Sequence, residues 1–279
     1  MSVFLKSGVV GWPIRHSLSP QLHRFWLSHH DINGEYLPFA VDPKNLREFL
    51  RGLTERGMQG INVTLPHKES VMGLVDHIDE SARRIGAVNT VVVQPNGELR
   101  GMNTDAFGFL ENLKDFFPNW QRNIKSAVVF GAGGAARSVL FALQEAGVSK
   151  IWIFNRTKPK ASKLALELGG NIKAYDWADY INFMSDASIV VNTTSLGMKG
   201  QPALDIDLTN LSRMALVYDI VYTPLETNLL KQARKRGNSV VGGLGMLLHQ
   251  ARPGFSAWFG IEPEVTIALR KHIVKVMKS

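Results

Sequence analysis

A glycine-rich turn constrains the fold of this chain more than any other feature. It reads Gly131-Ala132-Gly133-Gly134-Ala135-Ala136 and lies between a buried strand predicted over 125–130 and an apolar helix predicted over 138–146. Gly131 allows the tight turn, Gly133 lets the backbone approach a pyrophosphate, and Ala136 lets helix and strand pack closely. The free N–H groups at the start of the helix attract phosphate. In this setting, the turn predicts a doubly wound, dinucleotide-binding α/β domain.

The end of the next strand indicates which dinucleotide is bound. The strand predicted over 150–154 is followed by Asn155-Arg156-Thr157, with Lys158 and Lys160 behind them. Sites for NAD usually carry an acidic residue here, which holds the ribose hydroxyls. An acid would repel a 2′-phosphate, whereas the Arg156 guanidinium can bind one through charge-assisted hydrogen bonds. The sequence therefore favours NADP, although a solvated basic turn would contain the same residues.

Length and composition set further limits. The chain has 279 residues, enough for two domains, and 45% of them are hydrophobic. The absence of cysteine excludes disulfides, thiolate nucleophiles and Cys-ligated metals, and we expect no metal site. The net charge of +8 is scattered rather than striped, which favours small anionic ligands over nucleic acid. Neither a signal peptide nor an apolar run of membrane-spanning length is evident, so we expect a cytoplasmic protein with no membrane partner.

A second informative segment lies earlier in the chain, over residues 60–70. Here Asn62 and Thr64 alternate with apolar neighbours, as in a half-buried strand that a proline ends, and Lys68 follows just past it. Ligands bind at the carboxyl ends of strands in open α/β folds. A lysine at such a place can hold a carbonyl or hydroxyl oxygen and transfer protons. An ordinary strand and turn with a solvated lysine is the alternative.

Other predicted strand ends in the same part of the chain also carry polar side chains. The strand predicted over 3–10 leads to Ser17 and Ser19, and Ser19 is expected to cap a helix over 21–30. That cap would leave the Ser17 hydroxyl free for a ligand, although a plain capping turn would look the same. A hairpin with strands predicted over 87–93 and 99–103 adds further polar residues: Asn89, Thr90, Asn103, Thr104 and Asp105.

The remaining elements complete a two-domain α/β fold. The strand predicted over 187–192 precedes Thr193, Thr194 and Ser195, which either line the nicotinamide side or cap a turn. Two C-terminal helices find no place in the dinucleotide-binding sheet, so we expect them to return to the first domain. Gln250 would then lie in the cleft, or else face solvent. The expected division is 1–106 with 247–279 for a substrate-binding, catalytic domain, and 107–246 for an NADP-binding domain of the Rossmann type.

Taken together, these motifs resemble the shikimate dehydrogenase family over nearly the whole chain. The matching segments are Ser17 to Pro20, Asn62 to Lys68, Gly86 to Thr90, Asn103 to Asp105, Gly131 to Ala135, Asn155 to Thr157, Asn192 to Ser195, Asp219 to Pro224 and Gly245 to Gln250. The resemblance implies the reversible, NADPH-dependent reduction of 3-dehydroshikimate to shikimate, a step of aromatic amino-acid biosynthesis.

The resemblance also implies roles for individual residues. Lys68 would be catalytic and paired with Asp105 in proton transfer. The substrate carboxylate would contact Ser17 and Ser19, with Tyr222 nearby, and the ring hydroxyls would contact Asn62, Thr64, Asn89, Asp105 and Gln250. The cofactor would contact Gly131, Ala132, Gly133, Gly134, Ala135, Asn155, Arg156, Thr157, Lys160, Thr193, Thr194, Ser195, Val221, Gly243 and Met246.

Two departures and two rival functions accompany this interpretation. Gly242 stands where the family commonly has an acidic residue, and Arg252-Pro253 replaces small residues, so we expect a local kink in that helix. One rival is a quinate/shikimate dehydrogenase that uses NAD, against which Arg156 argues. The other is a catalytically silent ligand-binding paralogue, which the presence of both Lys68 and Asp105 disfavours. The family contains monomers and dimers, so the resemblance implies either state.

Overall fold

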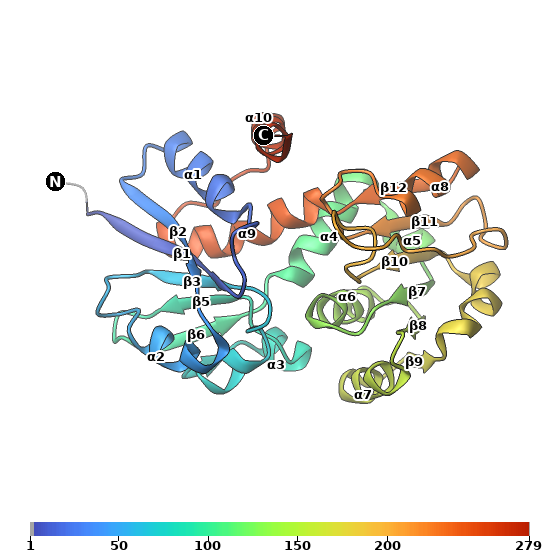
Figure 1. Cartoon of the computed structure of the whole chain (residues 1–279), viewed down its shortest axis with the longest axis horizontal. Helices are drawn as coiled ribbons and strands as arrows, with labels where there is room; N and C mark the ends of the chain where they lie inside the picture. Colours follow the sequence, from blue (N-terminus) through green and yellow to red (C-terminus); the bar gives the residue numbers. More distant parts are fainter. Residues whose placement is uncertain (1–2, 279) are drawn as a thin grey trace. The chain divides into compact units, whose positions relative to one another are not determined.

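The structure, a computed structural model, describes residues 3–278 and has an α/β fold with two six-stranded sheets (Figure 1). It divides into two compact units, Met1–Thr104 with Gln250–Ser279, and Asp105–His249. The α/β fold class expected from the sequence is confirmed. The chain passes from one unit to the other where α4 (Asp105–Phe116) begins and within α9 (Leu244–Phe259).

The first unit is built on a mixed sheet. Its strands are β1 (Leu5–Gly11), β2 (Gly34–Ala40), β3 (Gly60–Val63), β4 (His77–Ile78), β5 (Thr90–Val93) and β6 (Leu99–Met102), in the order β2-β1-β3-β5-β6-β4. Its helices are α1 (Ser19–His29), α2 (Leu46–Arg51), α3 (Glu80–Ile85), α10 (Ile267–Lys278) and the 3-10 helices η1 (Pro43–Asn45) and η2 (Ser70–Gly73). Val10, Ile61 and Val91, from three neighbouring strands, lie in one buried core.

Strand directions in this sheet gather the polar strand ends at one edge. β1 and β3 run parallel, so both end at the same edge. β5 is antiparallel to β3, and Asn62 pairs with Thr90, so β5 begins at that edge. β6 is antiparallel to β5 and pairs Met102 with Thr90, so β6 ends there. The sequences after β1, β3 and β6 and before β5 are therefore neighbours in space.

The second unit is an all-parallel, doubly wound sheet. Its strands are β7 (Ser126–Phe130), β8 (Lys150–Phe154), β9 (Ile172–Tyr175), β10 (Ile189–Asn192), β11 (Leu216–Asp219) and β12 (Ser239–Gly242). Their order is β12-β11-β10-β7-β8-β9, and every pair is parallel. Its other helices are α5 (Trp120–Asn123), α6 (Gly134–Glu145), α7 (Lys158–Leu168), α8 (Asn228–Arg236) and the 3-10 helix η3 (Trp177–Asp186). The chain leaves β7 in one direction and returns to β10 on the other side, so the glycine turn after β7 lies where the winding reverses, the usual ligand position in such sheets.

The capping role expected of Ser19 is wrong. Leu18 is the N-cap of α1, no side chain caps it, and Ser19 is the first helical residue. The Ser17 hydroxyl accepts a hydrogen bond from the Ser19 N–H over 3.3 Å, which still leaves its own O–H to donate to a ligand. The Ser17 hydroxyl thus bonds to the backbone at the start of the helix, a local hydrogen bond that serine forms readily.

Helices also occupy three other parts of the chain. Residues 43–51 form η1 and the short α2, which ends at Arg51 just before Gly52. α9 runs through Pro253 without interruption, and the expected kink there stays a prediction. Between α4 and β7, the short α5 buries Trp120.

Candidate active site

The ends of β1 and β3 bring Ser17 and Thr64 to the same edge of the first unit. The Thr64 N–H donates to the Val10 carbonyl over 2.9 Å, and the Ser17 N–H donates to the Ile14 carbonyl over 3.0 Å. A Cβ atom on Gly11 would lie 2.6 Å from Thr64 Cγ2 and 2.9 Å from Ile14 Cδ1. Only glycine therefore lets these two loops pack against each other.

A buried amide and hydroxyl network continues along this edge. Asn62 Nδ2 donates to the Asn89 carbonyl (3.2 Å) and to Thr90 Oγ1 (3.1 Å). Thr104 N–H donates to Asn89 Oδ1 over 2.8 Å, and Asn89 Nδ2 donates to Thr104 Oγ1 over 2.9 Å. Asn62, Asn89, Thr90 and Thr104 are all at most 5% exposed. Because buried polar groups are costly unless paired, this network holds its members in one arrangement.

Gln250 joins the same network. Its Oε1 accepts from Asn89 Nδ2 over 3.4 Å, and its backbone carbonyl accepts from Thr104 Oγ1 over 2.7 Å. Gln250 is half-buried, so it does not simply face solvent. The first unit thus brings together three of the predicted ring-hydroxyl ligands: Asn62, Asn89 and Gln250.

The two predicted catalytic residues flank this network along the chain. Lys68 is half-buried, and its carbonyl accepts from the Val88 N–H over 2.8 Å, which fastens its turn next to Asn89. Asp105 follows Thr104 directly, begins α4 and is 5% exposed. Lys68 belongs to the first unit and Asp105 to the second, and their pairing stays a prediction.

In the second unit, the glycine turn has the shape that phosphate binding requires. Gly131 has φ +113°, and a Cβ there would lie 2.5 Å from Thr193 Oγ1. No atom of the described residues lies within 4 Å of a Cβ built on Gly133, which is the N-cap of α6. The turn is thus closed at Gly131 and open at Gly133. Ala132, Gly134 and Ala135 complete it, and α6 begins at Gly134, four residues earlier than expected from the sequence.

The residues after β8 form an open basic turn. Asn155 Nδ2 donates to the Thr157 carbonyl over 2.9 Å, and Arg156, Thr157 and Lys160 are exposed. Lys158 differs, because its Nζ pairs with Asp176 over 2.6 Å. That bond and the nearby acids raise the pKa of Lys158. Arg156 is therefore presented to solvent directly after β8.

Asp219 organises the loop that contains Thr193, Thr194 and Ser195. Its Oδ1 accepts from Asn192 Nδ2 (2.9 Å) and from the Val221 N–H (3.0 Å), and its Oδ2 accepts from Thr227 Oγ1 (2.6 Å). Asn192 Oδ1 in turn accepts from the Thr194 N–H over 2.9 Å and from its hydroxyl over 2.7 Å. Burial raises the pKa of Asp219 to about 6, with the three bonds opposing that shift. Neither Asp219 nor Asn192 was predicted as a site residue, although both lie in matched motifs.

Val221 and Gly243, two further predicted cofactor residues, are joined by a backbone hydrogen bond. The Gly243 N–H donates to the Val221 carbonyl over 3.3 Å, and a Cβ on Gly243 would lie 1.9 Å from the Ile220 carbonyl oxygen. Met246 is buried on the following helix. Tyr222 is half-buried, and burial raises its pKa. Asn112 Nδ2 donates to the Gly242 carbonyl over 3.0 Å, so the backbone is anchored at Gly242.

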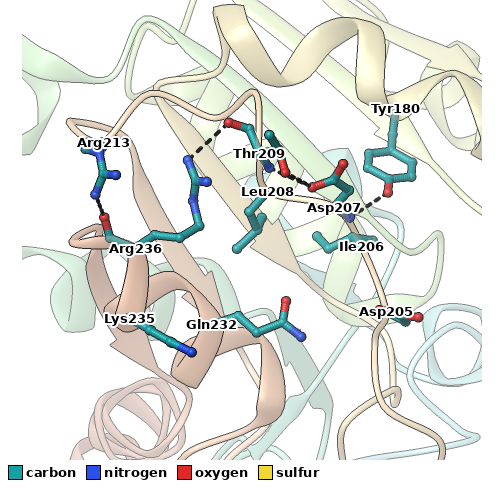
Figure 2. A pocket seen from close by; sticks show the side chains of 10 residues that line it. All are labelled: Tyr180, Asp205, Ile206, Asp207, Leu208, Thr209, Arg213, Gln232, Lys235 and Arg236. Atoms are coloured by element: carbon teal, nitrogen blue, oxygen red, sulfur yellow. Dashed lines mark hydrogen bonds between the residues drawn. The ribbon is translucent and has the colours of Figure 1, made fainter.

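A pocket in the second unit lies apart from all predicted residues. Figure 2 shows it between the loop 205–209, Tyr180 and the end of α8, with Arg213, Lys235 and Arg236 on its wall. The two arginines are used within the fold: Arg236 donates to the Leu211 carbonyl over 2.8 Å, and Arg213 donates to the Arg236 carbonyl. Cations also favour the carboxyl end of a helix. The pocket is therefore interpreted as part of the scaffold.

Two further structural features bear on function. Within residues 3–278, no three His, Asp or Glu side chains form a group that could hold a metal ion. Of the helices in the described part of the chain, none has the length and apolar character that crossing a bilayer requires.

The structure has the features of a two-domain, dinucleotide-dependent oxidoreductase. These are a glycine turn at the reversal point of a parallel sheet, an exposed arginine after the second strand of that sheet, and a separate α/β unit with a polar edge. Comparison with known proteins makes this specific. Residues 9–91 match the model of the shikimate dehydrogenase substrate binding domain, and residues 113–223 match that of shikimate / quinate 5-dehydrogenase. The chain belongs to the shikimate dehydrogenase family, as its motifs indicated.

Individual relatives cover almost the whole chain. The shikimate dehydrogenase (NADP(+)) of Paramagnetospirillum magneticum is 53% identical over 268 residues, which span 96% of this chain and 97% of the relative. The solved shikimate 5-dehydrogenase of Thermus thermophilus, in complex with NADP(H) and shikimate, is 35% identical with a TM-score of 0.83 and 98% of each chain covered. The quinate dehydrogenase of Corynebacterium glutamicum, in complex with NAD, is 30% identical with a TM-score of 0.90, covering 97% of this chain and 99% of that one.

Proposed function

We propose that this protein reduces 3-dehydroshikimate to shikimate with NADPH, reversibly, with Lys68 and Asp105 assisting proton transfer. The activity follows from membership of the family and from relatives about half identical that carry the name shikimate dehydrogenase (NADP(+)). The protein is accordingly an NADP-dependent oxidoreductase acting on a CH–OH group, with a role in the shikimate pathway. The observation that best supports the substrate is the buried network of Asn62, Asn89, Thr104 and Gln250, which suits a polyhydroxylated ring.

The second unit fits NADP. The open space at Gly133 lets a pyrophosphate approach the backbone, and α6 begins there with its free N–H groups. Exposed Arg156, with Thr157 and Lys160, suits a 2′-phosphate. When bound, NADPH supplies the hydride that is added to the C3 ketone carbon.

The first unit would hold the substrate and manage the proton. Ser17 and Ser19 face the carboxylate in this proposal, with Tyr222 nearby, and the amides of Asn62, Asn89 and Gln250 face the ring hydroxyls together with Thr64. The C3 oxygen gains negative charge as the hydride arrives, and the Lys68 ammonium stabilises it and gives it a proton. The Asp105 carboxylate orients that ammonium and accepts a hydrogen bond from the neighbouring substrate hydroxyl.

One alternative has a specific observation in its favour. The fold matches the NAD-bound quinate dehydrogenase of Corynebacterium glutamicum with a TM-score of 0.90. A quinate/shikimate dehydrogenase using NAD would lack a use for exposed Arg156, which favours NADP. The relatives about half identical carry the name shikimate dehydrogenase (NADP(+)), which favours shikimate. We further propose that the enzyme works in the cytoplasm as a monomer or homodimer, without nucleic acid or membrane partners.

An isotope experiment tests the proposed reaction. The protein is incubated with 3-dehydroshikimate and NADPH that is deuterated at the transferred position. We expect shikimate with deuterium at C3, identified by NMR. Product without deuterium at C3, or no shikimate at all, would refute the proposal.

A further inference from the structure

One tyrosine outside all predicted site residues binds directly to the substrate network. The Tyr36 hydroxyl, on β2, donates to Asn62 Oδ1 over 2.6 Å. Tyr36 is fully buried, and Asn62 is 5% exposed. Burial raises the pKa of Tyr36 well above its usual range, with a hydrogen bond from Ser19 opposing that shift, so the hydroxyl keeps the proton that it donates.

The partners of Asn62 determine which way its amide points. Nδ2 lies 3.2 Å from the Asn89 carbonyl oxygen, which can only accept. A flipped amide would place Oδ1 against that oxygen and leave Nδ2 facing Tyr36. The observed orientation uses both Nδ2 hydrogens inside the protein, on Asn89 and Thr90. Towards a substrate, Asn62 can therefore offer only the second lone pair of Oδ1.

A histidine holds the tyrosine ring in place. The His23 ring stacks on the Tyr36 ring with centroids 3.9 Å apart and an interplanar angle of 4°. Burial lowers the pKa of His23 to about 3, so the ring is neutral. Within residues 3–278 neither of its ring nitrogens has a hydrogen-bond partner. His23 therefore acts on Tyr36 by packing, and Trp26 and Phe255 pack around it.

We propose that Tyr36 is a positioning residue for substrate recognition, which acts through Asn62 by fixing its amide so that Oδ1 accepts a hydrogen bond from a substrate hydroxyl. The proposal rests on the proposed function. It assigns to β2 a role that no motif at the strand ends indicated.

Kinetics of three variants test the proposal: Tyr36→Phe, Asn62→Ala and the double variant. Tyr36→Phe keeps the ring that stacks on His23 and removes only the hydroxyl. Losing the bond from the Tyr36 hydroxyl to Asn62 should raise the KM for shikimate roughly 5- to 30-fold, with the KM for NADP unchanged. If Tyr36 acts through Asn62, the double variant should have the same KM for shikimate as Asn62→Ala alone.

Tyr180→Phe is the matched control. It likewise removes a tyrosine hydroxyl, one that accepts a hydrogen bond from the Asp207 N–H over 2.7 Å in the wall of the scaffold pocket (Figure 2). Its KM for shikimate should equal that of the wild type. The proposal is overturned if Tyr36→Phe also has the wild-type KM, or if its effect is undiminished when Asn62 is already alanine.

A second readout does not need activity. Hydrogen exchange of the Asn62 side-chain amide, followed by NMR, should be slow in the wild type and faster in Tyr36→Phe. Equal exchange in both proteins would overturn the positioning role. If the wild type does not oxidise shikimate, the proposed function fails, while this measurement still decides whether Tyr36 fixes Asn62.

Discussion

Replacing Gly131 by alanine should destabilise the second unit, and the structure allows the cost to be worked out. Gly131 has φ +113°, a conformation that costs a residue with a side chain about 1–3 kcal/mol. The new Cβ would also lie 2.5 Å from Thr193 Oγ1, so Thr193 must move. That hydroxyl donates to the Phe130 carbonyl over 2.6 Å, and its loss adds about 0.5–1.5 kcal/mol. The expected destabilisation is about 2–4 kcal/mol.

Gly133→Ala separates the structural role from the cofactor role. A Cβ at Gly133 meets no described atom within 4 Å, and its backbone φ of −102° suits alanine. This variant should therefore unfold like the wild type but bind NADP more weakly, because its methyl group occupies the space of the pyrophosphate.

Differential scanning calorimetry and NADP titration measure both effects. For a unit of this size, Gly131→Ala should lower the Tm by about 4–16 °C. A wild-type Tm for Gly131→Ala would refute the strain argument. Wild-type NADP affinity in Gly133→Ala would refute the placement of the pyrophosphate.

Three other variants probe the catalytic and cofactor residues. Lys68→Ala should lower kcat about 10²- to 10⁴-fold with a much smaller rise in the KM for shikimate, and near-normal turnover would remove Lys68 from the mechanism. Arg156→Ala should raise the KM for NADP about 10- to 100-fold and leave that for NAD unchanged; a parallel loss with both cofactors would contradict a 2′-phosphate contact. Burial raises the pKa of Asp219 from 3.8 to about 6, so the folded state holds this proton more tightly than the unfolded state does. The resulting stabilisation is full below pH 3.8 and is lost as the pH rises through about 6. The free energy of unfolding of the wild type, relative to Asp219→Asn, should then fall by about 2 kcal/mol between about pH 4 and pH 7; a constant difference would argue against this titration.

The elements best predicted from the sequence are those with a strong local signal. β8 occurs as expected, because a short apolar run bounded by polar residues specifies a buried strand. The glycine turn lies between β7 and α6, since glycine alone adopts the backbone conformation at Gly131. The polar ends of β1, β3 and β6 could be identified for the same local reasons.

Features that depend on tertiary contacts were missed. The two-residue strand β4 is defined by its pairing with β6, and its own sequence carries no strand signal. The prediction that Ser19 caps α1 was wrong, because a hydroxyl near the start of a helix can bond in more than one way. The Ser17 hydroxyl, and not that of Ser19, accepts the bond from the backbone N–H there. Tyr36 resembles an ordinary core residue of β2, and only its bond to Asn62 connects it with the site. No periodicity could have indicated that contact, since the two residues belong to strands on either side of β1.

The central claim is that this protein oxidises shikimate with NADP. Initial rates for shikimate and quinate, each with NADP and with NAD, test it most directly. The highest kcat/KM should occur with shikimate and NADP, and replacing either partner should lower it. A clear preference for NAD or for quinate, or no turnover in any combination, would contradict the claim.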